Sequence, residues 1–137
     1  MVEEITTDKL QSLIERKEIV FVDFSAAWCG PCRELGKLIE TEVMPKIMED
    51  KNIAFVKIDI DKDENRKYIR NLGLTAVPVI YVWHKGEPVT FEKDEEPQKK
   101  GKRTRRKKQV QVALEGYRPD IAYVIDWVIS HLRGVSA

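Results

Sequence analysis

Two cysteines, Cys29 and Cys32, stand with only Gly30 and Pro31 between them. Apolar residues recur at helical spacing after the second cysteine, and proline suits a first helical turn, so the first cysteine is expected at a helix N-terminus. Unpaired backbone N–H groups and the helix dipole favour a thiolate there, and the thiol pKa in such motifs falls to roughly 3.5 to 7.5 from about 8.5. Because the thiolate attacks disulfides, the spacing predicts thiol–disulfide exchange. Cys29 is expected to be the more exposed thiol and the first to be alkylated.

Other uses of two cysteines are less favoured. They are too few for the disulfide framework of a small secreted domain. A closed zinc site needs four ligands, and only His84, in an expected turn, and His131, near the C-terminus, remain to complete one. We interpret both histidines as surface residues and expect no metal or other cofactor; a zinc or iron–sulfur site is the alternative.

Three short apolar segments are typical of buried strands: Ile19 to Phe24, Ile53 to Ile60, and Val79 to Trp83. Two of them carry a charged residue, Asp23 in the first and Lys57 in the second. Burying a carboxylate is costly, so both residues are candidates for function. The alternative is a satisfied buried ion pair that takes no part in catalysis.

Helical patterns separate these strands. One begins at Thr7, which is expected to cap it, and a second follows Cys32 and is expected to kink or break at Pro45. A third runs from Asp63 to Leu72, and an amphipathic helix covers 121–132. The order α, β, α, β, α, β predicts an α/β fold whose sheet contains parallel strands and is covered by helices on both faces.

Charge is distributed unevenly along the chain. From Lys99 to Lys108 eight of ten residues are positive, and because the whole chain carries a net charge of +1, the remainder carries −7. Val110, Val112 and Leu114 alternate as in a final strand, so a basic insertion at about 92–108 is expected in the last β-hairpin. We interpret it as a solvated excursion. The alternative is docking to an acidic protein or to nucleic acid, led by phosphate contacts because the segment has no aromatic residue.

The chain of 137 residues, 42% of them hydrophobic, is expected to form a single domain over 1–137. Its start, Met1 to Glu4, has no basic region followed by an apolar stretch, and no apolar run approaches the roughly 18 residues that span a bilayer. We therefore expect a cytoplasmic protein without membrane contact.

The segment Trp28-Cys29-Gly30-Pro31-Cys32 resembles the active-site pentapeptide of the thioredoxin family in full; that family is among the proteins from which the thiol pKa range above comes. Asp23 stands six residues before the first cysteine, where thioredoxin-like proteins keep a buried acid, and Lys57 matches the lysine beside it. Val77-Pro78 resembles the family's cis-proline step, and Gly116 matches the glycine that closes the last strand.

Two positions depart from the family pattern. Ser25 replaces the first of two tryptophans common before the motif, and Lys37 stands where the helix usually has a kinking proline. The stretch from Cys32 to Leu38, together with Val43, is closer to the thioredoxin-like domains of disulfide-interchange carriers than to thioredoxin proper.

The resemblance implies a thioredoxin-like fold with a mixed central sheet, and a redox-active Cys29–Cys32 disulfide in place of a cofactor. It implies that Cys29 attacks a protein disulfide and Cys32 resolves the mixed disulfide. Asp23 would take the proton from Cys32, and Lys57 would tune that carboxyl. The residues expected to contact substrate are Trp28, Gly30, Pro31, Val77, Pro78 and Gly116.

Two functional hypotheses follow. The first is an enzyme, a protein-disulfide reductase whose partners are disulfide-containing proteins and an upstream reductase. The second is a thioredoxin-fold binding adaptor that docks to an acidic partner or nucleic acid through Lys99 to Lys108. The intact cysteine pair favours the enzyme, because an adaptor has no physical need for both thiols.

Overall fold

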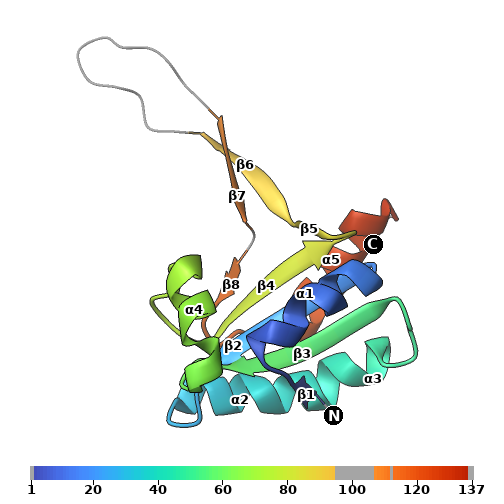
Figure 1. Ribbon diagram of the computed structural model, residues 1–137. Coiled ribbons are helices and arrows are strands. Elements are labelled where there is room, and N and C mark those ends of the chain that lie inside the picture. Colours follow the sequence, from blue (N-terminus) through green and yellow to red (C-terminus); the bar gives the residue numbers. More distant parts are fainter. Residues whose placement is uncertain (1, 95–106, 112, 136–137) are drawn as a thin grey trace, which may run out of the picture.

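The computed structural model describes residues 2–94, 107–111 and 113–135. A six-stranded sheet lies at the centre, with strand order β1-β3-β2-β4-β5 and with β8 also paired to β4 (Figure 1). Its strands are β1 (Glu3–Glu4), β2 (Ile19–Ser25), β3 (Ile53–Asp59), β4 (Val79–His84), β5 (Glu87–Pro88) and β8 (Ala113–Glu115).

The sheet is mixed, as the resemblance implied. Strands β1, β3 and β2 run parallel to one another, whereas β4 is antiparallel to β2, β5 and β8. The two-residue strand β1 lies outside the expected elements, because two exposed residues carry no recognisable period. The three strands expected from apolar runs are β2, β3 and β4.

Helices cover both faces of the sheet, and each face has its own core. On one face α2 (Gly30–Leu38), α3 (Met44–Ile47) and α5 (Ile121–Arg133) pack against side chains such as Phe21 and Phe55. On the other face α1 (Thr7–Arg16) and α4 (Arg66–Leu72) pack against side chains such as Val22 and Val56.

The alternation of a strand then decides where the charged residues of β2 and β3 lie. Phe21 belongs to the core under α2, and successive side chains of a strand point to opposite faces. Asp23, two residues after Phe21, is therefore on the α2 side, and so is Lys57, two residues after Phe55. The register pairs Asp23 with Lys57 directly.

The helical stretch after Cys32 is interrupted as expected near Pro45. A π-helical turn over Ile39–Val43 joins α2 to α3, and Pro45 lies in the first turn of α3. Proline has no backbone N–H to donate, so the hydrogen-bond ladder has to change at this point.

Helix boundaries differ from the expectation by small shifts. Thr6, not Thr7, precedes the first turn of α1, and Thr7 instead donates its backbone N–H to the Asn65 side chain at 2.8 Å. The segment expected as one helix over 63–72 begins with a 3₁₀ turn, Asp63–Asn65. It ends at Gly73, whose φ of +75° is the left-handed conformation that closes a helix.

A second, two-stranded sheet is formed by β6 (Thr90–Asp94) and β7 (Lys107–Gln111). This ribbon projects from the body of the molecule in Figure 1. The two ends of the segment expected as a loop, 92–108, are therefore strands, with Glu92 paired to Gln109 and Asp94 to Lys107. Apart from Lys107 and Lys108, the basic run lies outside the described residues.

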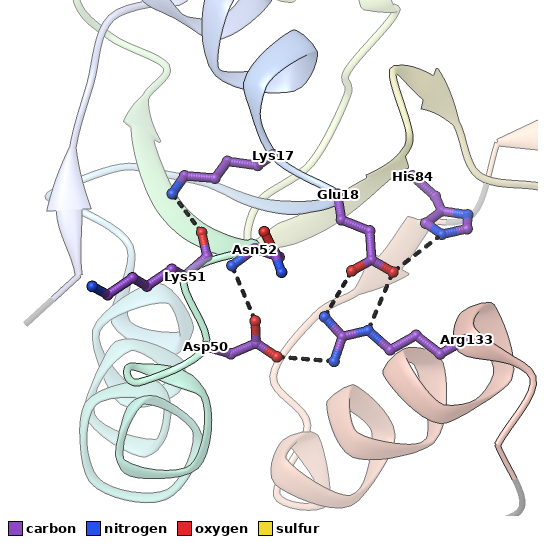
Figure 2. A network of polar contacts seen from close by, with 7 residues as sticks. All are labelled: Lys17, Glu18, Asp50, Lys51, Asn52, His84 and Arg133. Atoms are coloured by element: carbon purple, nitrogen blue, oxygen red, sulfur yellow. Dashed lines mark hydrogen bonds and ion pairs between the residues drawn. The ribbon is translucent and has the colours of Figure 1, made fainter.

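A polar network joins the start of β2, the end of α3 and the end of α5 (Figure 2). Arg133 donates to both carboxylate oxygens of Glu18, at 2.8 and 3.2 Å, and to Asp50 at 2.9 Å. His84 lies 3.7 Å from Glu18 and is half-buried, so the expectation that His84 is a surface residue is wrong. His131 is exposed and stacks on Trp127.

Within the part of the chain that the structure describes, no helix is both long and apolar enough to cross a membrane.

Candidate active site

The cysteine pair lies at the junction between β2 and α2. Cys29 is the N-cap residue of α2, and the backbone N–H of Cys32 donates to its sulfur at 3.1 Å. The two residues form a disulfide, with Cα atoms 5.2 Å apart. The helix N-terminus and this N–H donor would both stabilise negative charge on Cys29 once the disulfide is reduced.

Exposure does not distinguish the two cysteines. Cys29 is 5% exposed and Cys32 is 4% exposed, so the expectation that Cys29 is the more accessible thiol is wrong for this oxidised form. A difference in reactivity must then come from the position of Cys29 at the helix N-terminus.

The peptide bond between Val77 and Pro78 is cis, as the resemblance implied. It faces the cysteines, because the carbonyl oxygen of Val77 lies 3.9 Å from the Cys29 sulfur and Val77 packs against the small buried cluster of Ala26, Cys29 and Cys32. Gly116 donates its backbone N–H to the carbonyl of Pro78 at 2.8 Å, and its φ of +76° suits glycine. One hydrogen bond thus holds the end of β8 against the cis step.

Asp23 is 2% exposed, and its Oδ1 atom has no hydrogen-bond partner in the part of the chain that the structure describes. Burial raises the pKa of this carboxyl from 3.8 to about 7, although the charge of Lys57 lowers it. Asp23 forms no salt bridge with any described residue, so the alternative of a satisfied ion pair with Lys57 does not fit. Near neutral pH this carboxyl can therefore both accept and release a proton.

A hollow of about 740 Å³ beside α2 is lined by both the Asp23 carboxyl and the second cysteine, Cys32. Asp23, Lys57 and Cys32 all line it, together with small residues that include Ser25 and Gly36. Asp23 and the second cysteine therefore share one space. The described residues contain no group of three or more side chains suited to hold a metal ion.

The thioredoxin family model matches residues 1–107. The chain belongs to the thioredoxin family. It is 33% identical over 88 residues to thioredoxin of Echinococcus granulosus, covering 63% of this chain and 75% of that protein. It is also 33% identical over 90 residues to thioredoxin of Listeria monocytogenes, covering 65% and 81%.

A sequence relative with a shorter match is the thioredoxin H-type of Picea mariana, at 38% identity, where the match covers 59% of this chain and 60% of that protein's length. Among solved structures, chloroplastic thioredoxin z agrees with the family assignment: it has 28% sequence identity and a TM-score of 0.67, covering 97% of this chain and 95% of that one.

The structure brings every thioredoxin-type site residue expected from the sequence to one end of the sheet. Gly30 and Pro31 form the first turn of α2, and Trp28 precedes it with 68% of its surface exposed. Asp61 is a residue that sequence reasoning missed: its Oδ2 accepts a hydrogen bond from the Trp28 indole Nε1 at 2.7 Å. Its signal was its place just after β3, because the parallel strands β2 and β3 end at the same edge.

Proposed function

We propose that this protein is a thiol–disulfide oxidoreductase that reduces disulfides of other proteins. The observation that supports it best is the Cys29–Cys32 pair at the N-terminus of α2, facing the cis Val77–Pro78 step above an unpartnered, buried Asp23. The alternation of side chains along β2 and β3 and the family's pentapeptide indicate the same residues.

The reaction begins with reduced Cys29. Its thiolate attacks one sulfur of a substrate disulfide, the substrate S–S bond breaks, and a mixed disulfide forms as the first substrate thiolate leaves. The Cys32 backbone N–H, 3.1 Å from the Cys29 sulfur, favours the attacking thiolate.

Cys32 completes the exchange. Asp23 accepts the Cys32 proton through the shared hollow, and the Cys32 sulfur attacks Cys29, which releases the second substrate thiolate and forms the Cys29–Cys32 disulfide. Two electrons pass to the substrate. A carboxyl with a pKa of about 7 suits this step, because it is partly ionised at neutral pH and holds a proton readily. Lys57 limits how far burial raises that pKa.

The substrate chain lies across the exposed end of the site. Val77 offers its backbone to an extended segment, in the manner of an added strand. The residues around this contact are Trp28, Gly30, Pro31, Val77, Pro78 and Gly116.

Reduction of insulin by dithiothreitol tests the proposal, with precipitation of the freed B chain as the readout. Wild-type protein is expected to accelerate it, and Cys29→Ser is expected to return the rate to that of dithiothreitol alone. Cys32→Ser should instead trap a mixed disulfide that survives non-reducing electrophoresis. Equal rates with and without the wild-type protein would contradict the proposal.

We further propose that the protein acts in the cytoplasm, where thiols are kept mostly reduced and a reactive cysteine pair donates electrons. An upstream reductase would then return the Cys29–Cys32 disulfide to the dithiol. Fluorescence of the tagged full-length protein in its native cell tests the location.

A second function rests on the charged segment. We propose a single domain over 1–137 with an insertion at about 92–108, whose run from Lys99 to Lys108 docks to an acidic partner or to nucleic acid. The support for this proposal is the charge of the segment, because eight of the ten residues from Lys99 to Lys108 are positive while the rest of the chain is acidic. This binding would be separable from the thiol chemistry.

A further inference from the structure

A second groove, of about 380 Å³, adjoins the proposed substrate contact. Residues 73–79, Tyr81, Glu115 and Gly116 line it. Its lining therefore combines the loop after α4, the cis Val77–Pro78 step, the start of β4 and the end of β8. Figure 1 shows the ribbons of α4 and β8 next to each other. A polypeptide held at the cysteines has this groove beside it.

The register of β8 places one charged side chain at a defined position in the groove. Glu115 is paired with Val79, two residues beyond Val77, and the Gly116–Pro78 hydrogen bond anchors the residue next to it. Glu115 thus stands two residue steps from the backbone that would pair with substrate. A strand rises about 3.3 Å per residue, so two steps span roughly 6.6 Å. A long substrate side chain two positions from the reacting cysteine can therefore reach Glu115.

Glu115 forms no ion pair with any residue that the structure describes, and it is exposed. The Glu115 carboxylate acts on a neighbouring groove residue, because burial and then this charge raise the pKa of Tyr81, which lies two residues along β4 from Val79, the partner of Glu115. The groove is therefore an acidic extension of the contact surface, next to an apolar wall that suits an aliphatic stem.

We propose that this groove is a specificity subsite in which Glu115 selects protein disulfides that carry a lysine or arginine two residues from the attacked cysteine. The inference rests on the proposed reductase function. The occupant is an extended segment of the substrate, since the groove continues the surface at Val77, and charge complementarity identifies the side chain it accepts. An exposed ion pair of this kind favours the cationic substrate about two- to fivefold.

Peptide disulfides with a single variable position test the proposal. Two sets carry lysine, glutamine or glutamate, two residues before the cysteine in one set and two residues after it in the other. The full-length protein is expected to reduce the lysine peptide of one set about two- to fivefold faster than the glutamate peptide in kcat/KM. Glu115→Gln should bring the ratio to one, and Glu115→Lys should invert it. Added salt should shrink the wild-type ratio.

Glu87→Lys is the matched control. Glu87 is an exposed glutamate in β5, at the other end of β4, and its reversal changes the net charge equally. The lysine-to-glutamate ratio should stay at the wild-type value in this variant. Equal ratios in wild type and Glu115→Lys overturn the subsite while leaving the reductase function intact. Failure of wild-type protein to reduce any of the peptides overturns both.

Discussion

The strand β2 has a carboxylate near each end, and the two lie in opposite environments. Glu18, just before the strand, receives two hydrogen bonds from Arg133, and these lower the pKa of Glu18 below its usual value. Asp23, near the other end, has an unpartnered oxygen and a pKa raised to about 7 by burial. One end of the strand stabilises an ionised carboxylate, and the other end keeps a carboxyl that resists ionisation.

The difference separates stability from chemistry. At the Arg133 end the charges satisfy one another, and Asp50 also has its pKa lowered by hydrogen bonds from Arg133. At the cysteine end an unsatisfied carboxyl is retained although it opposes folding. A carboxyl that exchanges protons readily is useful to a thiol reaction and costly to the fold, so its presence beside the hollow supports a catalytic part.

Replacing Asp23 by Asn is expected to give the largest change. The folded-state pKa of about 7 exceeds the ordinary 3.8, so the folded state binds the proton more tightly and stability falls as pH rises through this window. A pKa difference of about three units between the folded and unfolded states lowers the free energy of unfolding by about 4 kcal/mol once the pH is above 7. Asp23→Asn should therefore raise the free energy of unfolding of the oxidised protein at pH 8 by about 2 to 4 kcal/mol.

Urea denaturation of the oxidised protein from pH 4 to pH 8 measures this effect, with the exposed Asp126→Asn as the matched control. The decline in stability from pH 4 to pH 8 should be nearly absent in the Asp23 variant. Resolution of the mixed disulfide by Cys32 should also slow. A wild-type stability that does not fall over this range would contradict the raised pKa.

Replacing Arg133 by Met is expected to have a smaller effect of opposite sign. Loss of three charged hydrogen bonds should lower the free energy of unfolding at pH 7 by about 1 to 3 kcal/mol. Because the pKa values of Glu18 and Asp50 are lowered, this contribution is present above about pH 4.5 and is lost as pH falls through their folded-state values.

Thermal or urea unfolding measures the Arg133 effect, with Arg118→Met as control, since within the described ranges Arg118 pairs only with the nearby exposed Asp120. Disulfide reduction should proceed at the wild-type rate in Arg133→Met. The Asp23 and Arg133 effects should also add within about 0.5 kcal/mol, because the two ends of β2 share no partner. Strong coupling between them would show that the two ends are not independent.

Removing the carboxylate that holds Trp28 is expected to change activity alone. Asp61→Ala frees the indole and should lower kcat/KM on a protein disulfide by about two- to fivefold, in line with about 1 kcal/mol for one hydrogen bond. Asp61→Asn keeps an acceptor oxygen and should retain most of the rate. If alanine and asparagine are equally slow, the carboxylate acts by its charge and not by positioning Trp28.

Shortening the ribbon is expected to leave both the stability and the disulfide reduction nearly unchanged. Replacing residues 92–109 by Asn-Gly keeps the Phe91–Val110 pair and suits a two-residue turn. The free energy of unfolding should change by less than about 0.5 kcal/mol and insulin reduction should persist, because the ribbon is a separate sheet. Binding to heparin resin should weaken, with elution at lower salt. An unfolded or inactive variant would mean that the ribbon supports the body.

The sequence predicted the residues around the cysteines better than it predicted the Arg133 network at the other end of β2. Asp23, Lys57 and the cis step were expected because a charge in an apolar strand, or a family motif, is visible locally. The Arg133 network was not expected, because it joins residues that are far apart in the sequence, from 18 to 133. Each of its members is a charged residue of a kind common on protein surfaces, so no local pattern marks it. The hydrogen bond from Trp28 to Asp61 was missed for the same reason: the parallel register of β2 and β3 brings together positions 33 residues apart.

The outer edge of β4 also affects how readily the protein aggregates. β5 pairs with Trp83 and His84, β8 pairs with residues 79–81, and the remaining Val82 carbonyl accepts the N–H of Val89 at 2.9 Å. The whole edge of β4 is thus occupied, and what it presents outward is two short strands, one of them containing Pro88. Two short edge strands offer no long row of free backbone groups to a strand of another protein, which protects this edge of the sheet from aggregation through edge-to-edge pairing.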